Sequence, residues 1–444
     1  MNLVVGIHEF IWGLLVDWIL FVGVYLTLGL DFIPLRLVPH ALRLWWAAVR
    51  QPPEGEGETG PFLNSMAALG GMIGMGNVTG VAAALVVGGP GVLIWVWIGS
   101  LVGFATKFAE TLLSTEYRTQ QPSGHWSGGP MYYLGQAMPA QLRWFGPLFA
   151  VAGALAMFGV GNTLQSQQLA AVLQEGLAVP PLLTGVVMAG LTYLVISGGL
   201  RRIGLSSAWL MPLSVCTYVL GCLAMLVPHL ADLPEVLATI VQQGLSPRAI
   251  ASGTILVAIS NGIRLGVLSN ESGMGTSPII LSVGKPGQPF YQACISMLLS
   301  LADVVVCTAT ALVVLLSGSY LRSQSPVEVV KQAFDWGFPG SHWLLVVAAI
   351  PFTFTTFTAF AYYGERCLEY LCGERSNQIY RLLWVALMVI GAVIDLDIIW
   401  KSTEVLNALV ALPNIIGIVV LSTKIFQETR SLLPPRLHLN LPQA

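Results

Sequence analysis

The chain has 444 residues, of which 55% are hydrophobic and only 9% are charged, and its net charge is −2. Soluble domains carry about 25% charged residues, so this composition excludes a soluble protein and predicts one embedded in the lipid bilayer. The apolar runs are about 20 residues or longer, which is the length of a spanning helix and about twice that of a membrane-barrel strand.

Eleven apolar segments are predicted to be membrane-spanning helices. The first begins near Phe10 with no basic residue before it, so we expect a retained span and not a cleaved signal peptide. No polar stretch between the spans is long enough to fold separately, which predicts a single bundle. The predicted spans are 10–32, 63–88, 90–115, 144–174, 179–199, 204–228, 250–282, 289–317, 342–371, 379–399 and 403–425.

The basic residues predict the orientation of the bundle. With the N-terminus outside, fifteen Lys and Arg residues lie on the cytoplasmic side, four lie on the outer side, and Arg264 lies within a span. Cytoplasmic loops carry the excess of Lys and Arg. We therefore expect a multi-pass plasma-membrane protein, of the bacterial inner membrane, with its N-terminus outside and its C-terminus in the cytoplasm.

The second and seventh spans are unusually rich in glycine. "NSMAALGGMIGMGNVTG" (64–80) has five glycines, and "AISNGIRLGVLSNESGMGTSP" (258–278) has four among many polar residues. Each glycine in a helix interior costs roughly 1 kcal/mol relative to alanine, so we predict that both helices are interrupted. Close packing between helices is the alternative explanation for the glycines, but it does not explain the polar residues of the seventh span.

The two glycine-rich spans occupy corresponding places in the chain. Without the first span, ten remain as two sets of five, and because five is odd the second set enters the membrane from the opposite side. Interrupted helices at matching positions of two inverted halves are typical of secondary transporters. The predicted fold is an all-α integral membrane protein of about 11 transmembrane helices, with an extra N-terminal span and a 5+5 inverted repeat. The predicted divisions are 1–60 (first span and cytoplasmic loop), 61–228 (first repeat), 229–430 (second repeat) and 431–444 (cytoplasmic tail).

An interrupted helix can serve as a binding site without charged side chains. At the break, one half-helix exposes N–H groups and the other exposes carbonyl groups. The N–H end attracts a carboxylate, and the carbonyl end attracts a cation. Two such breaks facing each other could hold a zwitterion together with a metal cation.

Several stretches resemble the alanine/glycine:cation symporter family, also called the sodium:alanine symporters. Among them are "GMGNVTGVAAALVVGGPG", "ATKFAETLLSTEYR", "GVGNTLQSQQLA", "SNESGMGTSPI", "YYGERCLEYL" and "NALVALPNIIGIVVLS". The resemblance covers nearly the whole chain after the first span. It implies the leucine-transporter fold, with five-plus-five inverted repeats, and a co-transported sodium ion without an organic cofactor.

The resemblance also implies positions for the substrate and the ion. The N–H groups of Met75 and Gly76 are expected to bind the substrate carboxylate. The resemblance further places Asn77 beside them, Gln165 in the substrate site, and Ser269 and Asn270 at the second break. For sodium it implies the hydroxyl groups of Thr355 and Thr356 and the carbonyl groups of Gly70 and Ile73, hard oxygen ligands that suit a hard cation.

Four positions near the expected pocket depart from the family. Met75, Gln167, Leu268 and Phe360 stand where threonine, asparagine, phenylalanine and tryptophan are expected. The backbone part of the site is kept while its side-chain lining changes. This leaves a small zwitterionic substrate as the expectation but puts alanine and glycine themselves in question.

Charged residues within the spans are functional candidates because burying them is costly. Arg264, Glu271 and Asp303 are candidates for coupling or gating, with a structural role as the alternative. Lys107 and Glu110 are three residues apart and are predicted to form an ordinary pair on one helix face. Glu365, Arg366 and Glu369 are predicted to form either an inner gate or a solvated helix end.

The sequence therefore predicts a sodium-coupled symporter that imports a small neutral amino acid by alternating access. A proton-coupled transporter of the same fold, with Asp303 or Glu271 titrating, stays open as an alternative. A membrane-embedded enzyme would need a nucleophile–base pair or a metal cluster, and neither is evident in the sequence. A passive channel would need a polar-lined pore, which the chain offers only at the two breaks. No nucleic-acid partner is expected, and the sequence makes no prediction of the oligomeric state.

Overall fold

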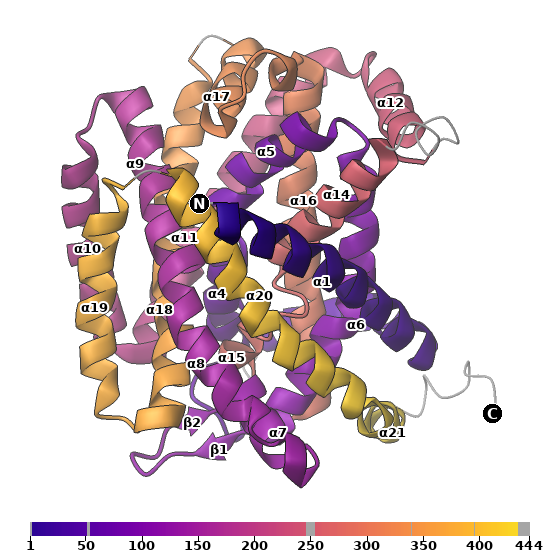
Figure 1. Ribbon diagram of the computed structural model, residues 1–444, viewed down its shortest axis with the longest axis vertical. Helices are drawn as coiled ribbons and strands as arrows, with labels where there is room; N and C mark the ends of the chain where they lie inside the picture. The colour runs from indigo at the N-terminus through magenta and orange to yellow at the C-terminus, as the bar shows by residue number, and fades with distance from the viewer. Residues whose placement is uncertain (1, 51–53, 246–253, 339, 395, 434–444) are drawn as a thin grey trace.

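Helices form almost all of the protein, as the long apolar runs require, and they pack side by side (Figure 1). This computed structural model describes residues 2–50, 54–245, 254–338, 340–394 and 396–433. The helices that contain the predicted spans are α1 (Asn2–Gly29), α4 (Pro61–Met72) with α5 (Thr79–Gly88), α6 (Val92–Glu116), α8 (Phe145–Phe158) with α9 (Leu164–Leu177), α10 (Pro181–Ile196), α11 (Gly199–Leu226), α14 (Thr254–Asn270) with α15 (Ser277–Leu281), α16 (Pro289–Ser317), α18 (His342–Cys372), α19 (Ser376–Gly391) and α20 (Leu396–Val420).

The number of spans depends on how the interrupted helices are counted. Within the described ranges, five helices are long and apolar enough to cross a membrane individually, and seven do so if each of two bent pairs is one span. Other predicted spans correspond to shorter apolar helices, such as α10. The count of eleven therefore stays a prediction, as do the boundaries of the two repeats.

The polar connections contain short elements that hydropathy did not predict. They are α2 (Ile33–Arg36), α3 (Val38–Arg50), the hairpin of β1 (Thr119–Gln120) and β2 (Trp126–Ser127), α7 (Pro130–Gln136), α12 (Leu233–Leu245), α17 (Pro326–Gly337) and α21 (Ser422–Leu432). Helix α17 shows why they form. Pro326 stands at its first turn, where no N–H is needed, and Val330 and Phe334 on one face are buried.

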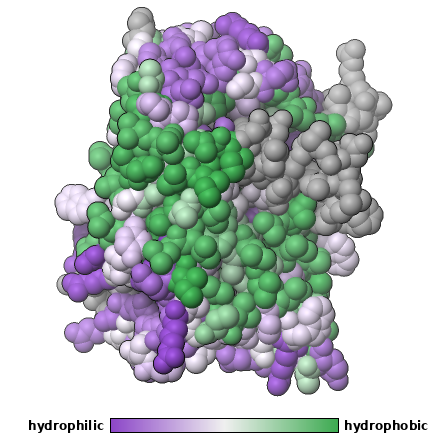
Figure 2. Space-filling view, turned by 60° about the vertical axis from the view of Figure 1, so that its left-hand side comes forward, coloured by the Kyte–Doolittle hydropathy of each residue, from purple (hydrophilic) through white to green (hydrophobic). Residues whose placement is uncertain are grey.

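Apolar side chains form a band at mid-height on the face of the bundle that carries α10 and α19 (Figure 2). This band is green in Figure 2 and lies between polar caps at the two ends. On α10 it includes exposed Leu183, Val187 and Leu194, and on α19 it includes Ile379 and Leu383. A soluble protein rarely exposes so large an apolar surface, and a lipid bilayer is its expected environment.

Spans at matching positions of the two predicted repeats pack against each other. Helix α6 contacts α16, α8 contacts α18, and α10 contacts α19. These are the second, third and fourth spans of each predicted set of five. An inverted repeat with a pseudo-twofold axis would place these partners together.

The end of the bundle that carries the β1–β2 hairpin, here called the hairpin end, is closed by a buried ionic cluster. Glu365 of α18 accepts hydrogen bonds from Arg366 (2.5 Å) and from Arg381 of α19 (2.5 and 2.8 Å). Arg366 also pairs with Glu369 at 2.7 Å, and Glu369 contacts His125 of the hairpin at 2.9 Å. The alternative of a solvated helix end is wrong, because these side chains are buried.

The loop before α4 is tied to the same cluster. Glu58 accepts a hydrogen bond from the backbone N–H of Trp126 at 2.9 Å. Burial raises the pKa of the Glu58 carboxyl group, and the charges of Arg366 and His125 oppose that rise. The start of α4, the hairpin and the ends of α18 and α19 are thus held together.

We expect Glu365→Ala to lower the free energy of unfolding by about 3–5 kcal/mol, since it leaves two largely buried arginines without their carboxylate partner. Denaturation of the purified protein in detergent would measure this change. Glu374→Ala is the matched control, because Glu374 lies at the rim of the cluster and its side chain is 35% exposed. Equal losses of stability in both variants would contradict the expectation.

Candidate functional site

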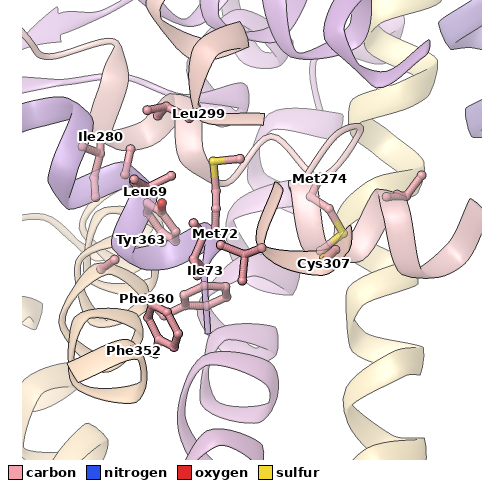
Figure 3. Packing of buried hydrophobic residues seen from close by; sticks show 14 of the residues in the cluster. Leu69, Met72, Ile73, Met274, Ile280, Leu299, Cys307, Phe352, Phe360 and Tyr363 are labelled. Carbon is pink, nitrogen blue, oxygen red and sulfur yellow. The ribbon is translucent and has the colours of Figure 1, made fainter. Parts of the chain in front are cut away.

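The second predicted span is interrupted where its glycines cluster. Helix α4 ends at Met72, Ile73 and Gly74 are extended, a 3₁₀ turn covers Met75–Asn77, and α5 resumes at Thr79. The two halves are bent by 59°. Figure 3 shows Leu69, Met72 and Ile73 at the end of α4, packed close to Phe360 and Tyr363 of α18.

The N–H groups released at this break have different partners. The N–H of Gly74 donates to Asn77 Oδ1 at 3.1 Å, and that of Met75 donates to Gln165 Oε1 of α9 at 3.1 Å. The N–H of Gly76 has no hydrogen-bond partner among the described residues. A Cβ atom built on Gly76 would meet nothing within 4 Å, so this glycine faces open space.

The seventh predicted span is interrupted as well. Helix α14 ends at Asn270 and α15 begins at Ser277. Between them Glu271, Gly273 and Gly275 have positive φ angles of 53°, 83° and 70°. Glycine adopts this conformation easily, whereas for glutamate it is uncommon.

A buried carboxylate joins the two breaks. Asp303 Oδ1 of α16 accepts hydrogen bonds from Asn77 Nδ2 (2.5 Å) and from Ser269 Oγ (2.6 Å), and Asn77 also donates to Ser269 Oγ at 3.0 Å. With its amide nitrogen turned towards Asp303, Asn270 donates to Oδ2 at 2.8 Å. Asp303 and Asn270 are therefore not on the cavity wall, and their hydrogen bonds hold the residues of the two breaks in place.

The predicted pairing of Lys107 with Glu110 is wrong. Lys107 Nζ donates to the carbonyl oxygen of Asn270 at 2.6 Å, whereas Glu110 accepts from the N–H of Gly275 (3.1 Å) and from Asn414 (2.5 Å). Each charge thus faces the half-helix end of opposite polarity, the ammonium at the carbonyl end of α14 and the carboxylate near the N–H end of α15. The i,i+3 spacing predicted that the two side chains pair with each other, but each of them instead binds a backbone group at the second break.

A cavity of about 260 Å³ lies between the two breaks. It extends along α5 as far as Val87, away from the hairpin end. The predicted site residues on its wall are Gly76, Asn77, Gln165, Arg264, Ser269, Glu271, Thr356 and Phe360. Met75 is not on the wall, and the side chain of Leu268 lies outside the described residues.

Four polar residues on the same wall were not predicted from the sequence, Gln168, Asn261, Thr403 and Asn407. Gln168 lies three residues after Gln165, almost one helical turn further along α9, and this spacing could have identified it. Thr403 and Asn407 on α20 are four residues apart and so lie on one face of that helix. Nothing local in the sequence connects them with the breaks.

Oxygen atoms gather at the carbonyl end of α4, where the sodium ion is expected. Thr356 Oγ1 donates to the carbonyl oxygen of Gly70 at 2.9 Å. Thr355 and the hydroxyl of Ser207 on α11 both lie beside Gly70. Thr355 Oγ1 donates to two carbonyl oxygens of its own helix, at 2.8 and 3.0 Å. The Ser207 hydroxyl is buried without a hydrogen-bond partner in the described structure. These hard oxygens, with Ile73 at the adjoining end of α4, fit a small cation.

Comparison with known proteins places the chain among membrane transporters. The model of the sodium:alanine symporter family matches residues 1–434. The chain is 34% identical over 439 residues to the sodium/alanine symporter AgcS of Methanococcus maripaludis, with 97% of each protein covered. It is 35% identical over 435 residues to an uncharacterized transporter of Haemophilus influenzae, covering 96% of this chain and 94% of the relative.

The fold is also that of a solved transporter structure. The crystal structure of MhsT in complex with L-phenylalanine superposes with a TM-score of 0.59 at 16% identity, covering 83% of this chain and 89% of MhsT. The leucine-transporter fold that the sequence motifs imply is thereby confirmed. So is the prediction of a transporter and not an enzyme.

We expect Gly76→Val to abolish transport without preventing folding, because the added side chain would enter the cavity and its Cβ atom would meet no protein atom within 4 Å. Uptake into proteoliposomes, together with the elution profile of the purified protein, measures both effects. Gly190→Val on α10 is the matched control, since Gly190 also has open space around its Cβ position but is exposed on the outer surface. Normal uptake by the Gly76 variant would refute this placement of the substrate.

Proposed function

The chain belongs to the sodium:alanine symporter family, and on that basis we propose that it couples sodium entry to the uptake of a small neutral amino acid. The observation that carries the proposal is the position of Gly76, which lies on the cavity wall and whose N–H has no hydrogen-bond partner among the described residues. Gly76 lies four residues after Met72, which is at the carbonyl end of α4 where the oxygen atoms gather. One interrupted helix thus offers a carboxylate site and a cation site a few residues apart.

Gln165 links substrate binding to the break. Its Oε1 atom accepts the hydrogen bond of the Met75 N–H, which is one of the two groups expected to bind the substrate carboxylate. An arriving carboxylate would replace this amide oxygen and form a stronger, charge-assisted hydrogen bond. The freed glutamine amide could then turn its N–H groups towards the same carboxylate.

Sodium would act on the shape of the same helix. An ion bound by Gly70, Ile73, Thr355 and Thr356 joins the end of α4 to α18 and fixes the angle at which the break is held. The substrate then meets N–H groups that are already positioned, so binding of either solute favours binding of the other. This reciprocity is what coupled transport requires.

The shape of the cavity supports alternating access. It extends away from the hairpin end, which the buried ionic cluster around Glu365 and Arg366 closes. With the orientation predicted from the basic residues, the hairpin end is cytoplasmic and the site is reached from outside. One sodium ion driven by about 100 mV contributes ~2.3 kcal/mol, and a tenfold sodium gradient adds about 1.4 kcal/mol.

Proton coupling remains the second candidate for the driving ion. It would require a titrating carboxylate that the cavity reaches, and Glu271 is the carboxylate on the described wall. The two candidates differ in what drives uptake in proteoliposomes. A sodium gradient without a pH difference drives only the first, and a pH difference without sodium drives only the second.

We expect Thr356→Val to raise the sodium concentration needed for half-maximal uptake by at least about tenfold, because it removes one oxygen ligand while keeping the side-chain shape. Thr355→Val should act in the same direction. Thr358→Val is the control, since its hydroxyl donates only to the Thr355 carbonyl of its own helix, at 3.0 Å. The cation site is refuted if the Thr355 and Thr356 variants keep the sodium dependence of the wild type.

We also expect small aliphatic amino acids to compete for uptake better than serine or asparagine. Met72, Val160, Leu164 and Phe360 present apolar surface to the cavity. An added methylene in such surroundings is worth about 1–3 kcal/mol, whereas an unpaired hydroxyl gains nothing there. Competition of labelled alanine uptake by unlabelled amino acids measures the order. Preference for serine or asparagine would overturn the apolar pocket without overturning amino-acid transport.

A further inference from the structure

Glu271 is a buried carboxylate on the cavity wall that forms no ion pair within 4.0 Å among the described residues. Its exposure is only 3%, and neither carboxylate oxygen makes a hydrogen bond of ordinary geometry in the part of the chain that the structure describes. The nearby donors, the Thr276 hydroxyl and the Ser277 N–H at the start of α15, are both neutral. It follows α14 directly, at the second break, with a φ angle of 53°. A glutamate held in this conformation, desolvated and beside a cavity, is costly unless something else binds it.

The neighbouring residues do not neutralise Glu271. Lys107 is the cation that acts on it electrostatically, but Lys107 Nζ donates to the carbonyl of Asn270, and no ion pair within 4.0 Å joins the two among the described residues. Glu110 and Asp303, which also surround Lys107, add two further negative groups. Tyr363 of α18 brings a second buried polar group without a described partner. Three carboxylates thus lie around the single ammonium of Lys107 among the described residues, while the other cation, Arg264, lies on the cavity wall about two helical turns before Glu271.

We propose that Glu271 binds the ammonium group of the transported amino acid. This assignment depends on the proposed amino-acid transport, and it gives each end of a zwitterion its own break. The carboxylate would lie at the N–H groups of the first break, and the ammonium at Glu271 in the second. The hydrogen bond between Asn77 and Ser269 holds these breaks together, next to Gly76 on one side and two residues before Glu271 on the other.

The arrangement explains how the site tells an amino acid from a simple carboxylic acid. The N–H of Gly76 recognises any carboxylate, so it cannot make this distinction. A desolvated carboxylate at Glu271 can make it, because a solute without an ammonium group leaves that charge unpaired in a buried place. The cavity then admits zwitterions and rejects anions of the same size.

The test is binding of labelled L-alanine to the purified full-length protein at saturating sodium, with unlabelled L-alanine or propionate as competitor. Propionate is alanine without its amino group. We expect the wild type to prefer alanine strongly and Glu271→Gln to reduce the ratio of alanine affinity to propionate affinity roughly 10- to 100-fold. An unchanged ratio, with both affinities lowered alike or only the sodium or pH dependence shifted, would overturn the assignment.

Glu369→Gln is the matched control. Glu369 is equally buried, at 3% exposure, but it lies at the hairpin end and not on the cavity wall. Its variant should keep the wild-type ratio. If the wild type itself binds no small neutral amino acid, the proposed function fails, and this outcome is distinct from failure of the Glu271 assignment.

A second variant covers the case in which Glu271→Gln does not fold. Glu271→Asp keeps the charge but withdraws it by one methylene group. We expect β-alanine, whose ammonium lies one methylene further from its carboxylate, to gain at least about fivefold relative to alanine in this variant. No gain for β-alanine would count against the assignment.

Discussion

Inside a bilayer, a backbone N–H or C=O group that leaves a helix must find another partner, because no lipid atom can replace it. The two interrupted helices create such groups at the centre of this bundle. The surrounding helices are arranged to receive them. Lys107 and Glu110 of α6 face the second break, and Gln165 of α9 and Thr356 of α18 face the first. Polar residues that look misplaced in apolar spans are thus partners of the opened backbone.

The sequence predicted this architecture well where the signal was periodic or compositional. Long apolar runs located the helices, and glycine density located both breaks to within a few residues. The prediction failed where a partner comes from a distant segment. Spacing along α6 suggested that Lys107 binds Glu110, because local rules cannot include the carbonyl of Asn270, more than 150 residues away. Ser207 and Asn407 could not be predicted for the same reason. Ser207 lies beside Gly70 because of how α11 packs, and Asn407 lies on the cavity wall because of how α20 packs.

The site roles that the family resemblance implies are of two kinds, backbone roles and side-chain roles, and the structure agrees better with the first kind. Backbone roles depend on chain geometry, and the structure places Gly76 on the cavity wall and Gly70 beside Thr356. Side-chain roles depend on rotation about the helix axis, which a motif does not record. Met75 therefore offers its N–H to Gln165, while its side chain is fully buried away from the wall. Asn270, adjacent to Ser269 in the motif, binds Asp303 on the far side of the break.

Asp303 links these observations to transport. Its carboxylate contacts Asn77 from the first break and Ser269 from the second, and it belongs to α16, which packs against α6. The two breaks, α6 and α16 are therefore joined by buried polar contacts that would be costly to separate. Helices α8, α18, α10 and α19 form a second packed group. A movement that exposes the site to the other side of the membrane would separate these two groups of helices. We expect the separation near Gln165 and Thr356, because each of these residues makes only one described hydrogen bond to the first interrupted helix. The polar network itself would then move as one unit with the bound solute.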